Sequence, residues 1–262
     1  MTLFRHEWKM NYKSLLIWAI CVGICCGGCI LLFESVAESM EDMAETFAQM
    51  GGFSAAFGMD KVSIATIDGF YAAEISIIFS LGGAMFAAMT GAVLLSKEEE
   101  GHTAEFLHTL PVGRGYIFGW KYGALLALIV MFNVIGIAFD LAGFLCIGQE
   151  IPQREYLLYH FMSLVMQIEI GSICFFVSAV CKRKQLGLAL GLAVLLYIVD
   201  IMVHIVPDLE SIKWITPYYF ANAADIFSSG EPQWGLMMAG AFISVLAVLA
   251  GGIVYRTRDI TA

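Results

Sequence analysis

The sequence has little charge and little proline. Of its 262 residues, 60% are hydrophobic and 14% are charged, and the mean hydropathy is +0.80. An ordinary globular domain is about a quarter charged, so this composition places the chain among membrane proteins. The five prolines all fall outside the long apolar runs. The sequence therefore lacks the proline-interrupted spans that many secondary transporters use.

The sequence also lacks the motifs of several chemistries. Without G-x-x-x-x-G-K-[ST] it has no phosphate-binding loop, so it cannot itself hydrolyse ATP. His6-Glu7 begins like H-E-x-x-H, but Met10 takes the place of the second histidine, and no G-x-S-x-G occurs. We expect no catalytic and no metal-binding residues. The basic residues form no patch, so we expect no nucleic-acid partner either.

The seven cysteines give no paired extracellular framework of disulfides, because all lie within or at the ends of apolar runs. Cys21, Cys25 and Cys29 recur at helical spacing, and packing explains them better than metal or redox chemistry does.

Six apolar runs have the length of about 20 residues that crosses a bilayer as a helix. Barrel strands would be shorter and would alternate polar with apolar residues. The sequence therefore predicts an all-α polytopic membrane protein with a single transmembrane domain over residues 1–262. The predicted spans are approximately 14–33, 71–95, 121–144, 161–180, 186–206 and 236–255.

The basic residues predict the orientation of the spans, because lysine and arginine near helix ends stay cytoplasmic. Lys61, Arg154 and Lys213 would lie outside. The other side would hold Arg5, Lys9, Lys13, Lys97, Arg114, Lys121, Lys182, Arg183, Lys184, Arg256 and Arg258. Both termini are therefore expected in the cytoplasm, with the chain in the plasma membrane, such as a bacterial cytoplasmic membrane.

The connections carry further patterns. Residues 1–13 place aromatic and basic side chains on different helical faces, which favours an amphipathic helix in the membrane interface over a merely positive tail. A second amphipathic pattern continues after the first span until Gly51-Gly52. Only "CKRKQ" separates spans four and five, so we expect those two spans to form a tight antiparallel hairpin.

Residues 97–115, "KEEEGHTAEFLHTLPVGRG", form a charged island between the second and third spans. Gly101 can turn the chain, Thr103 can cap a helix of two turns, and Pro111 can end that helix. A half-apolar helix preceded by acidic residues suggests a docking surface, and a solvated connector is the alternative.

The island resembles a motif of the membrane subunits of type-2 ABC exporters, "E-x-G-T-x-E-x-L-x-x-x-P-V-x-R". The matching residues are Glu98 or Glu99, Gly101, Thr103, Glu105, Leu107, Leu110, Pro111, Val112 and Arg114. His102 departs from the motif, because it separates a glycine and a threonine that are usually adjacent. The segment "WITPYYFANAADIFSSG" is similar to the aromatic "SPFYYF-x-P" segment before the last span of that family.

The resemblance implies that the island is a cytoplasmic coupling helix, which fits a groove on a separate ABC ATPase subunit. This chain would bind no cofactor, and the partner would hold ATP and Mg. The residues implied in coupling are Glu99, Gly101, Thr103, Glu105, Phe106, Leu107, Leu110, Pro111 and Arg114.

Ionisable and polar residues inside the spans are costly and need a reason. Asn133, Asp140, Glu169, Tyr197 and Asp200 are candidates for an acidic, aromatic-lined outward path for a cationic or amphiphilic substrate. The alternative is local pairing of Asp200 with His204, one turn away, and snorkelling of Asp140 toward the outer surface.

Two glycine pairs allow close helix approach, Gly23 with Gly27 and Gly187 with Gly191. Packing within the chain is the default interpretation of such pairs. The resemblance implies instead a seam with a second permease copy, identical or related, because the two membrane subunits of that family meet through spans one and five.

We therefore expect the permease subunit of an ATP-driven exporter, moving a drug or antimicrobial peptide outward. Export of a lipid-linked glycan or polysaccharide is an alternative within the family. An ion-coupled secondary transporter or channel, supported by the buried carboxylates, is the alternative outside it.

Overall fold

A computed structural model describes residues 2–103 and 112–258, and every regular element in these residues is a helix. Six stretches in this part of the chain are long and apolar enough to cross a membrane, which confirms the predicted number of spans. The long elements are α1 (Thr2–Ala48), α3 (Ile67–Phe70) with π-helical η1 (Tyr71–Ile75) and α4 (Ser76–Val93), α7 (Arg114–Ile147), α8 (Gln153–Val180), α9 (Leu186–Ile205) and α11 (Trp234–Thr257).

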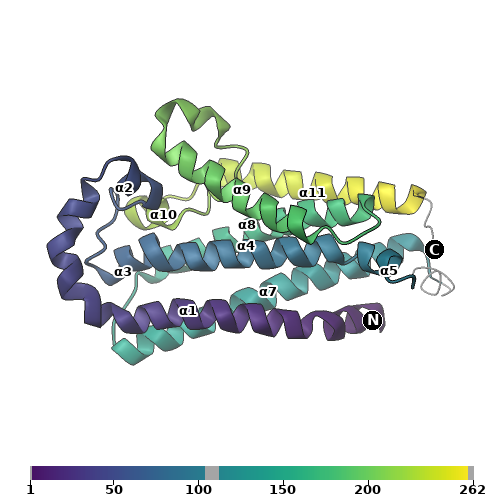
Figure 1. Cartoon of the computed structure of the whole chain (residues 1–262), viewed down its shortest axis with the longest axis horizontal. Coiled ribbons are helices and arrows are strands. Elements are labelled where there is room, and N and C mark those ends of the chain that lie inside the picture. Colours follow the sequence, from purple (N-terminus) through teal and green to yellow (C-terminus); the bar gives the residue numbers. More distant parts are fainter. Residues whose placement is uncertain (1, 104–111, 259–262) are drawn as a thin grey trace.

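The short elements gather at the two ends of the bundle (Figure 1). α5 (Ser96–Glu100) lies at the end where α1 begins and α11 ends. α2 (Gly52–Phe57), the 3-10 helix η2 (Pro207–Ile212) and α10 (Ala223–Ser229) lie in the opposite half. The start of α1 and the end of α11 thus lie at the same end of the bundle, as an even number of spans requires. The cytoplasmic placement of that end stays a prediction.

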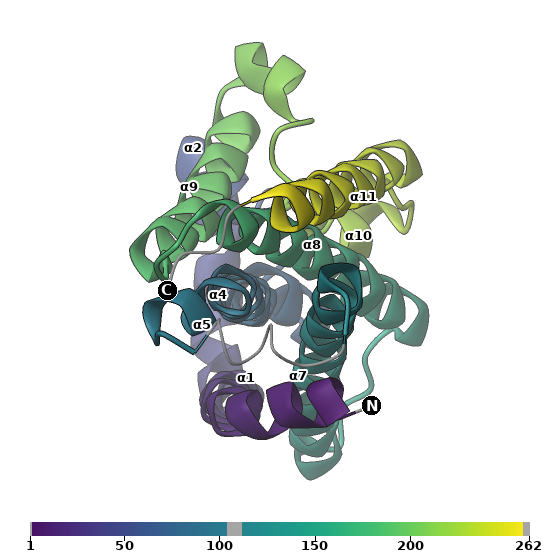
Figure 2. The ribbon, with the colours of Figure 1, turned by 90° about the vertical axis from the view of Figure 1, so that its right-hand side faces the viewer.

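The long helices form three layers, visible end-on in Figure 2. α1 packs against α7, α4 packs against α8, and on the far side α9 covers α4 while α11 covers α8. The middle layer is the most enclosed, with 67% of the apolar window of α4 buried against 22% in α11. The outer helices expose leucine, isoleucine and valine, which suits contact with lipid tails.

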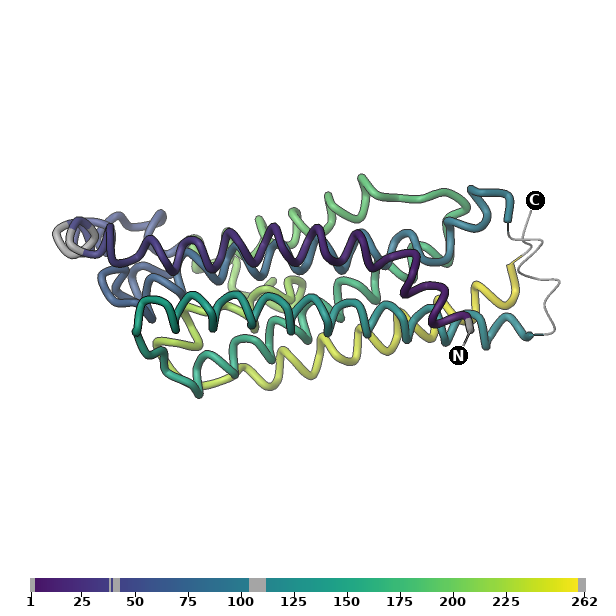
Figure 3. The backbone as a smooth tube through the Cα atoms, turned by 90° about the horizontal axis from the view of Figure 1, so that it is seen from below, coloured from purple at the N-terminus to yellow at the C-terminus, as the bar shows by residue number. Residues whose placement is uncertain are grey.

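The amphipathic N-terminal stretch is continuous with the first span, because α1 runs unbroken from Thr2 to Ala48. Figure 3 shows the first turns of α1 at an angle to the rest of the helix. α1 ends before Gly51, whose φ of 58° breaks the helix, as the glycine pair predicted. The location of residues 1–13 in the membrane interface stays a prediction.

The expected tight hairpin of spans four and five is wrong. Residues 181–185 join α8 to α9, but α9 packs mainly against α4, and α11 packs against α8 instead. A short connection fixes the order of two helices along the chain, whereas side-chain packing decides which helices touch.

Candidate functional site

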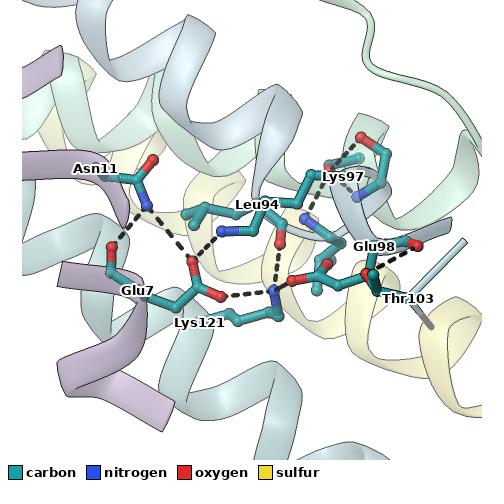
Figure 4. Close-up of polar contacts among 10 residues, drawn as sticks. Glu7, Asn11, Leu94, Lys97, Glu98, Thr103 and Lys121 are labelled. Atoms are coloured by element: carbon teal, nitrogen blue, oxygen red, sulfur yellow. Dashed lines mark hydrogen bonds and ion pairs between the residues drawn. The ribbon is translucent and has the colours of Figure 1, made fainter. Parts of the chain in front are cut away.

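The charged island begins with α5, and its first charged residues meet side chains of two spans (Figure 4). Lys97 and Lys121 each form an ion pair with Glu7 of α1, and Glu98 forms one with Lys121 of α7. We call these four residues the α5 ion-pair cluster. Two carboxylates and two ammonium groups balance, so the cluster can be buried without net charge.

Lys121 is the centre of the cluster, and its side chain is 1% exposed. Its Nζ donates to Glu7 Oε1 at 2.8 Å and to the carbonyl oxygen of Leu94 at 2.6 Å, and it also bonds Glu98. These three partners use all three ammonium donors. Leu94 is the C-cap residue of α4. The ammonium therefore also satisfies a terminal carbonyl of that helix and complements its negative end. One side chain thus joins α1, α4, α5 and α7.

The next acidic residue joins α5 to the end of the last span. Glu99 forms an ion pair with Arg258, just after α11. Arg114, at the start of α7, donates to the carbonyl oxygen of Arg258 at 2.7 Å. Glu99 and Arg114 stand before and after residues 104–111, so both flanks of the island converge on one residue.

α8 holds the beginning of α5. Ser178 Oγ accepts hydrogen bonds from the backbone N–H groups of Leu95 and Ser96, both at 3.0 Å. This serine therefore supplies the cap that the α5 sequence lacks. Glu100 Oε1 lies 3.7 Å from Lys184 Nζ in the α8–α9 connection, and each side chain is 39% exposed, so this ion pair is weak. Glu100 Oε2 also accepts a hydrogen bond from the backbone N–H of Lys184 at 2.6 Å, an acceptor role that glutamine can keep.

The turn after α5 differs from the predicted one. Gly101 has φ −86°, and the left-handed residue is His102, with φ 52°. The residue that departs from the family motif thus makes the turn expected of Gly101. Thr103 N–H donates to the Glu98 carbonyl oxygen at 2.8 Å and closes α5. The other predicted coupling residues, Glu105, Phe106, Leu107, Leu110 and Pro111, lie outside the described residues.

Asp140 is fully buried, so snorkelling to the outer surface is wrong. The Tyr71 hydroxyl donates to Asp140 Oδ2 at 2.8 Å and also lies 3.0 Å from His160 Nε2. Because a hydroxyl carries one hydrogen, Tyr71 must accept from His160 Nε2–H. The Tyr156 hydroxyl donates to the same carboxylate oxygen at 3.4 Å. Asp140 therefore joins η1, α7 and α8.

Asn133 is part of another buried polar network. Its Nδ2 donates to Gln167 Oε1 at 2.7 Å and to the Ile129 carbonyl oxygen at 2.9 Å. Gln167 Nε2 in turn donates to Ser163 Oγ at 3.2 Å. These bonds tie α7 to α8 rather than leaving Asn133 facing a path.

Tyr197 and Asp200 lie together as predicted, on the wall of one cavity. This cavity has a volume of about 30 Å³ and lies among η1, α4, α9, α10 and the tip of α2, in the half of the bundle opposite the termini. We call it the outer cavity, because the predicted orientation places that half outside. Its polar lining consists of Ser76, Ser80, Tyr197, Asp200, Tyr218 and Asn222.

An ionic group stands beside the outer cavity. His204 Nδ1 lies 2.9 Å from the Asp200 carbonyl oxygen and 3.7 Å from Asp200 Oδ1, so the expected local contact exists. On the other side of the imidazole, Asp225 of α10 pairs with Lys61. Burial alone would raise the pKa of Asp225, but the bonds and charges of His204 and Lys61 hold this pKa below its usual value.

Glu169 lies elsewhere, on a smaller cavity of about 10 Å³ that Trp214, Phe220 and Gly240 also line. A Cβ at position 240 would stand 2.1 Å from Glu169 Oε2, so only glycine there admits the carboxylate. The five proposed path residues thus occupy four separate environments, of which only the outer cavity brings two of them together.

The glycine pair of α1 packs against another helix of the same chain, α7. Gly23 and Gly27 are buried, and a Cβ on Gly23 would stand 2.5 Å from the Phe139 ring of α7. That face of α1 is therefore not available to a second copy. Gly187 and Gly191 of α9 are exposed and have nothing within 4 Å of an added Cβ, so a seam there stays a prediction.

Sequence reasoning missed Glu7, Lys121, Tyr71 and His160. In the sequence, Glu7 stands out only as part of an incomplete H-E-x-x-H motif, and Lys121 only as a marker of orientation. The available signal was charge next to apolar runs, because a buried ionic residue needs a partner of opposite charge. The sequence did not indicate which partner each residue has.

Comparison with known proteins identifies the family. A family model described as "ABC-2 family transporter protein" matches residues 1–255. No curated protein matches the chain. The match covers all six spans and the island, in agreement with the resemblance found in the island motif. The protein is therefore a multi-pass membrane protein that belongs to the ABC-2 transporter family, as an ABC transporter permease.

Proposed function

We propose that the protein is the permease subunit of an ATP-driven exporter, which moves an amphiphilic substrate such as a drug or antimicrobial peptide out across the plasma membrane. A separate cytoplasmic ABC ATPase would bind ATP and Mg and dock on the island. The observation that carries this proposal is the α5 ion-pair cluster, which joins the start of the island to two spans.

The contacts around α5 support a mechanical role for the island. Glu98 leads to α7, Glu99 to the end of α11, and Ser178 to α8. A solvated connector would need none of these contacts. When the ATPase pulls the island, α5 would carry the displacement to helices in all three layers. If the bundle has two arrangements of its helices, nucleotide binding on the partner would then shift the equilibrium between them.

The proposal includes a second permease copy, identical or related. The exposed glycines of α9, Gly187 and Gly191, support a seam on that helix, since small residues let helix backbones approach closely. The same face exposes Leu188 and Leu195.

Pull-down with a candidate ABC ATPase, chosen from genes adjacent to the gene of this protein, tests the docking role. We expect Leu107→Asp and Leu110→Asp to reduce ATPase recovery by roughly 10-fold or more, because a carboxylate would be buried in an apolar groove. Leu209→Asp, in η2 at the other end of the bundle, is the control and should change nothing. Unchanged recovery with both island variants, or transport that continues without ATP under an ion gradient, would contradict the proposal and favour an ion-coupled transporter.

A further inference from the structure

The outer cavity contains a buried carboxylate with spare bonding capacity. Asp200 is 4% exposed, and its Oδ1 has no hydrogen-bond partner among the described residues. A buried acceptor without a partner destabilises the protein, and more so when it is charged. A bound group that donates a hydrogen bond to Asp200 Oδ1 would remove this destabilisation.

The neighbouring cationic groups leave this oxygen unbonded. Lys61 pairs with Asp225. His204 lies 3.7 Å from Asp200 Oδ1, which is beyond hydrogen-bond distance, and its Nδ1 is directed to the Asp200 carbonyl oxygen. The group of Lys61, His204, Asp200 and Asp225 therefore has a net charge of −1 when the imidazole of His204 is neutral, and in that state an ammonium group entering the cavity would balance the charge.

Aromatic rings complete the wall around the carboxylate. The rings of Tyr197 and Tyr218 lie 5.4 Å apart at 61°, and Phe57 at the end of α2 also lines the cavity. Ring faces attract cations through their quadrupole, and a carboxylate adds charge and a hydrogen-bond acceptor. This combination suits an ammonium group better than an anion or a neutral apolar group.

The volume limits the size of that group. A cavity needs about 10–15 Å³ to hold one water molecule. At about 30 Å³ the outer cavity has room for two or three groups of that size. A primary ammonium is about as large as water, whereas a trimethylammonium is several times larger.

We propose that the outer cavity binds a primary ammonium group, with Asp200 as its hydrogen-bond acceptor and Tyr197 and Tyr218 as its aromatic wall. The site would take the cationic head of an amphiphilic amine or the lysine side chain of a peptide. This proposal rests on the proposed export function for its place in transport, but the binding itself needs neither ATP nor a partner.

Binding of radiolabelled n-octylammonium to the purified full-length chain in nanodiscs tests the site, with empty nanodiscs as background. We expect Asp200→Asn to weaken binding about 10-fold or more, since a charge-assisted hydrogen bond contributes about 1.5–3 kcal/mol. Asp208→Asn, in exposed η2, is the matched control and should bind like wild type. n-Octanol and n-octyltrimethylammonium should compete poorly.

A second variant separates binding from folding. Ala221→Val would fill the cavity without changing any charge, because Ala221 lines it and is 3% exposed. We expect this variant also to lose octylammonium binding while keeping its monodisperse elution. Wild-type binding by both Asp200→Asn and Ala221→Val, or equal competition by octanol, would overturn the proposal. Because no ATPase is present, failure here leaves the pull-down result intact, and failure of the pull-down leaves the cavity site intact.

Discussion

A single buried ammonium group, that of Lys121, joins four helical elements at the end of the bundle where the chain begins. Each of its three donors has a different acceptor, so the side chain has one well-defined position. Loss of the Lys121 ammonium would leave Lys97 as the one cation of the cluster, beside two carboxylates, those of Glu7 and Glu98. An uncompensated buried charge is among the largest single-residue penalties in a protein.

Replacement of Lys121 therefore tests the cluster directly. We expect Lys121→Met to lower the free energy of unfolding by about 3–5 kcal/mol, measured by thermal or denaturant unfolding in detergent. Lys9→Met is the control, since Lys9 is exposed on the same helix as Glu7, and its effect should stay within about 0.5 kcal/mol. Equal stability of the two variants would show that the cluster contributes little.

At the scale of the helices, α4 and α8 of the middle layer approach each other closely, backbone against backbone. A Cβ on Gly91 would stand 2.4 Å from the carbonyl oxygen of Gly171. Backbone contacts of this kind depend on residues without side chains, because packing rather than water drives helix association in lipid. The middle layer is thus held at a spacing that only glycine permits.

Substitution of that glycine should separate the two helices. We expect Gly91→Ala to destabilise the protein by about 1–3 kcal/mol, because the added methyl overpacks the contact. Gly123→Ala in α7 is the matched control. Nothing lies within 4 Å of its added Cβ, so it should be neutral or stabilising by about 0.5–1 kcal/mol. A Gly91→Ala variant as stable as Gly123→Ala would contradict this packing.

The spans could be predicted because each produces about 20 consecutive apolar residues, a local signal. The pairing of the spans could not, because Glu7 meets Lys97 and Lys121 across 90 and 114 residues of sequence. Glycine spacing showed where helices can approach but not which helices do so. The spacing of Gly23 and Gly27 did not reveal that they pack against α7 of the same chain. Gly91 is not part of such a pair, so its contact with α8 could not be predicted. Tyr197 and Asp200 were placed together correctly because helical periodicity puts them on one face.

At the scale of the whole molecule, the island end and the outer cavity lie in opposite halves of the bundle (Figure 1). α9 and α4 line the outer cavity, and the carbonyl oxygen of Leu94 at the other end of α4 accepts a hydrogen bond from Lys121. A displacement of α5 would therefore reach the cavity along helices that span the full bundle. If the protein works as proposed, ATP binding on the partner rearranges the helices around the outer cavity through this connection.

The most direct measurement is the distance between spin labels at Glu150→Cys and Asp208→Cys, two exposed positions in the half of the bundle opposite the termini, in a cysteine-free background with the ATPase bound. We expect trapping of the ATPase with ATP and vanadate to shift this distance in the parent and in Glu100→Gln, whose ion pair is exposed and weak. In Glu98→Gln, which loses the charged link from α5 to Lys121, the ATPase should still bind and hydrolyse ATP but the shift should be clearly smaller than in the parent. A full shift in Glu98→Gln would contradict the account.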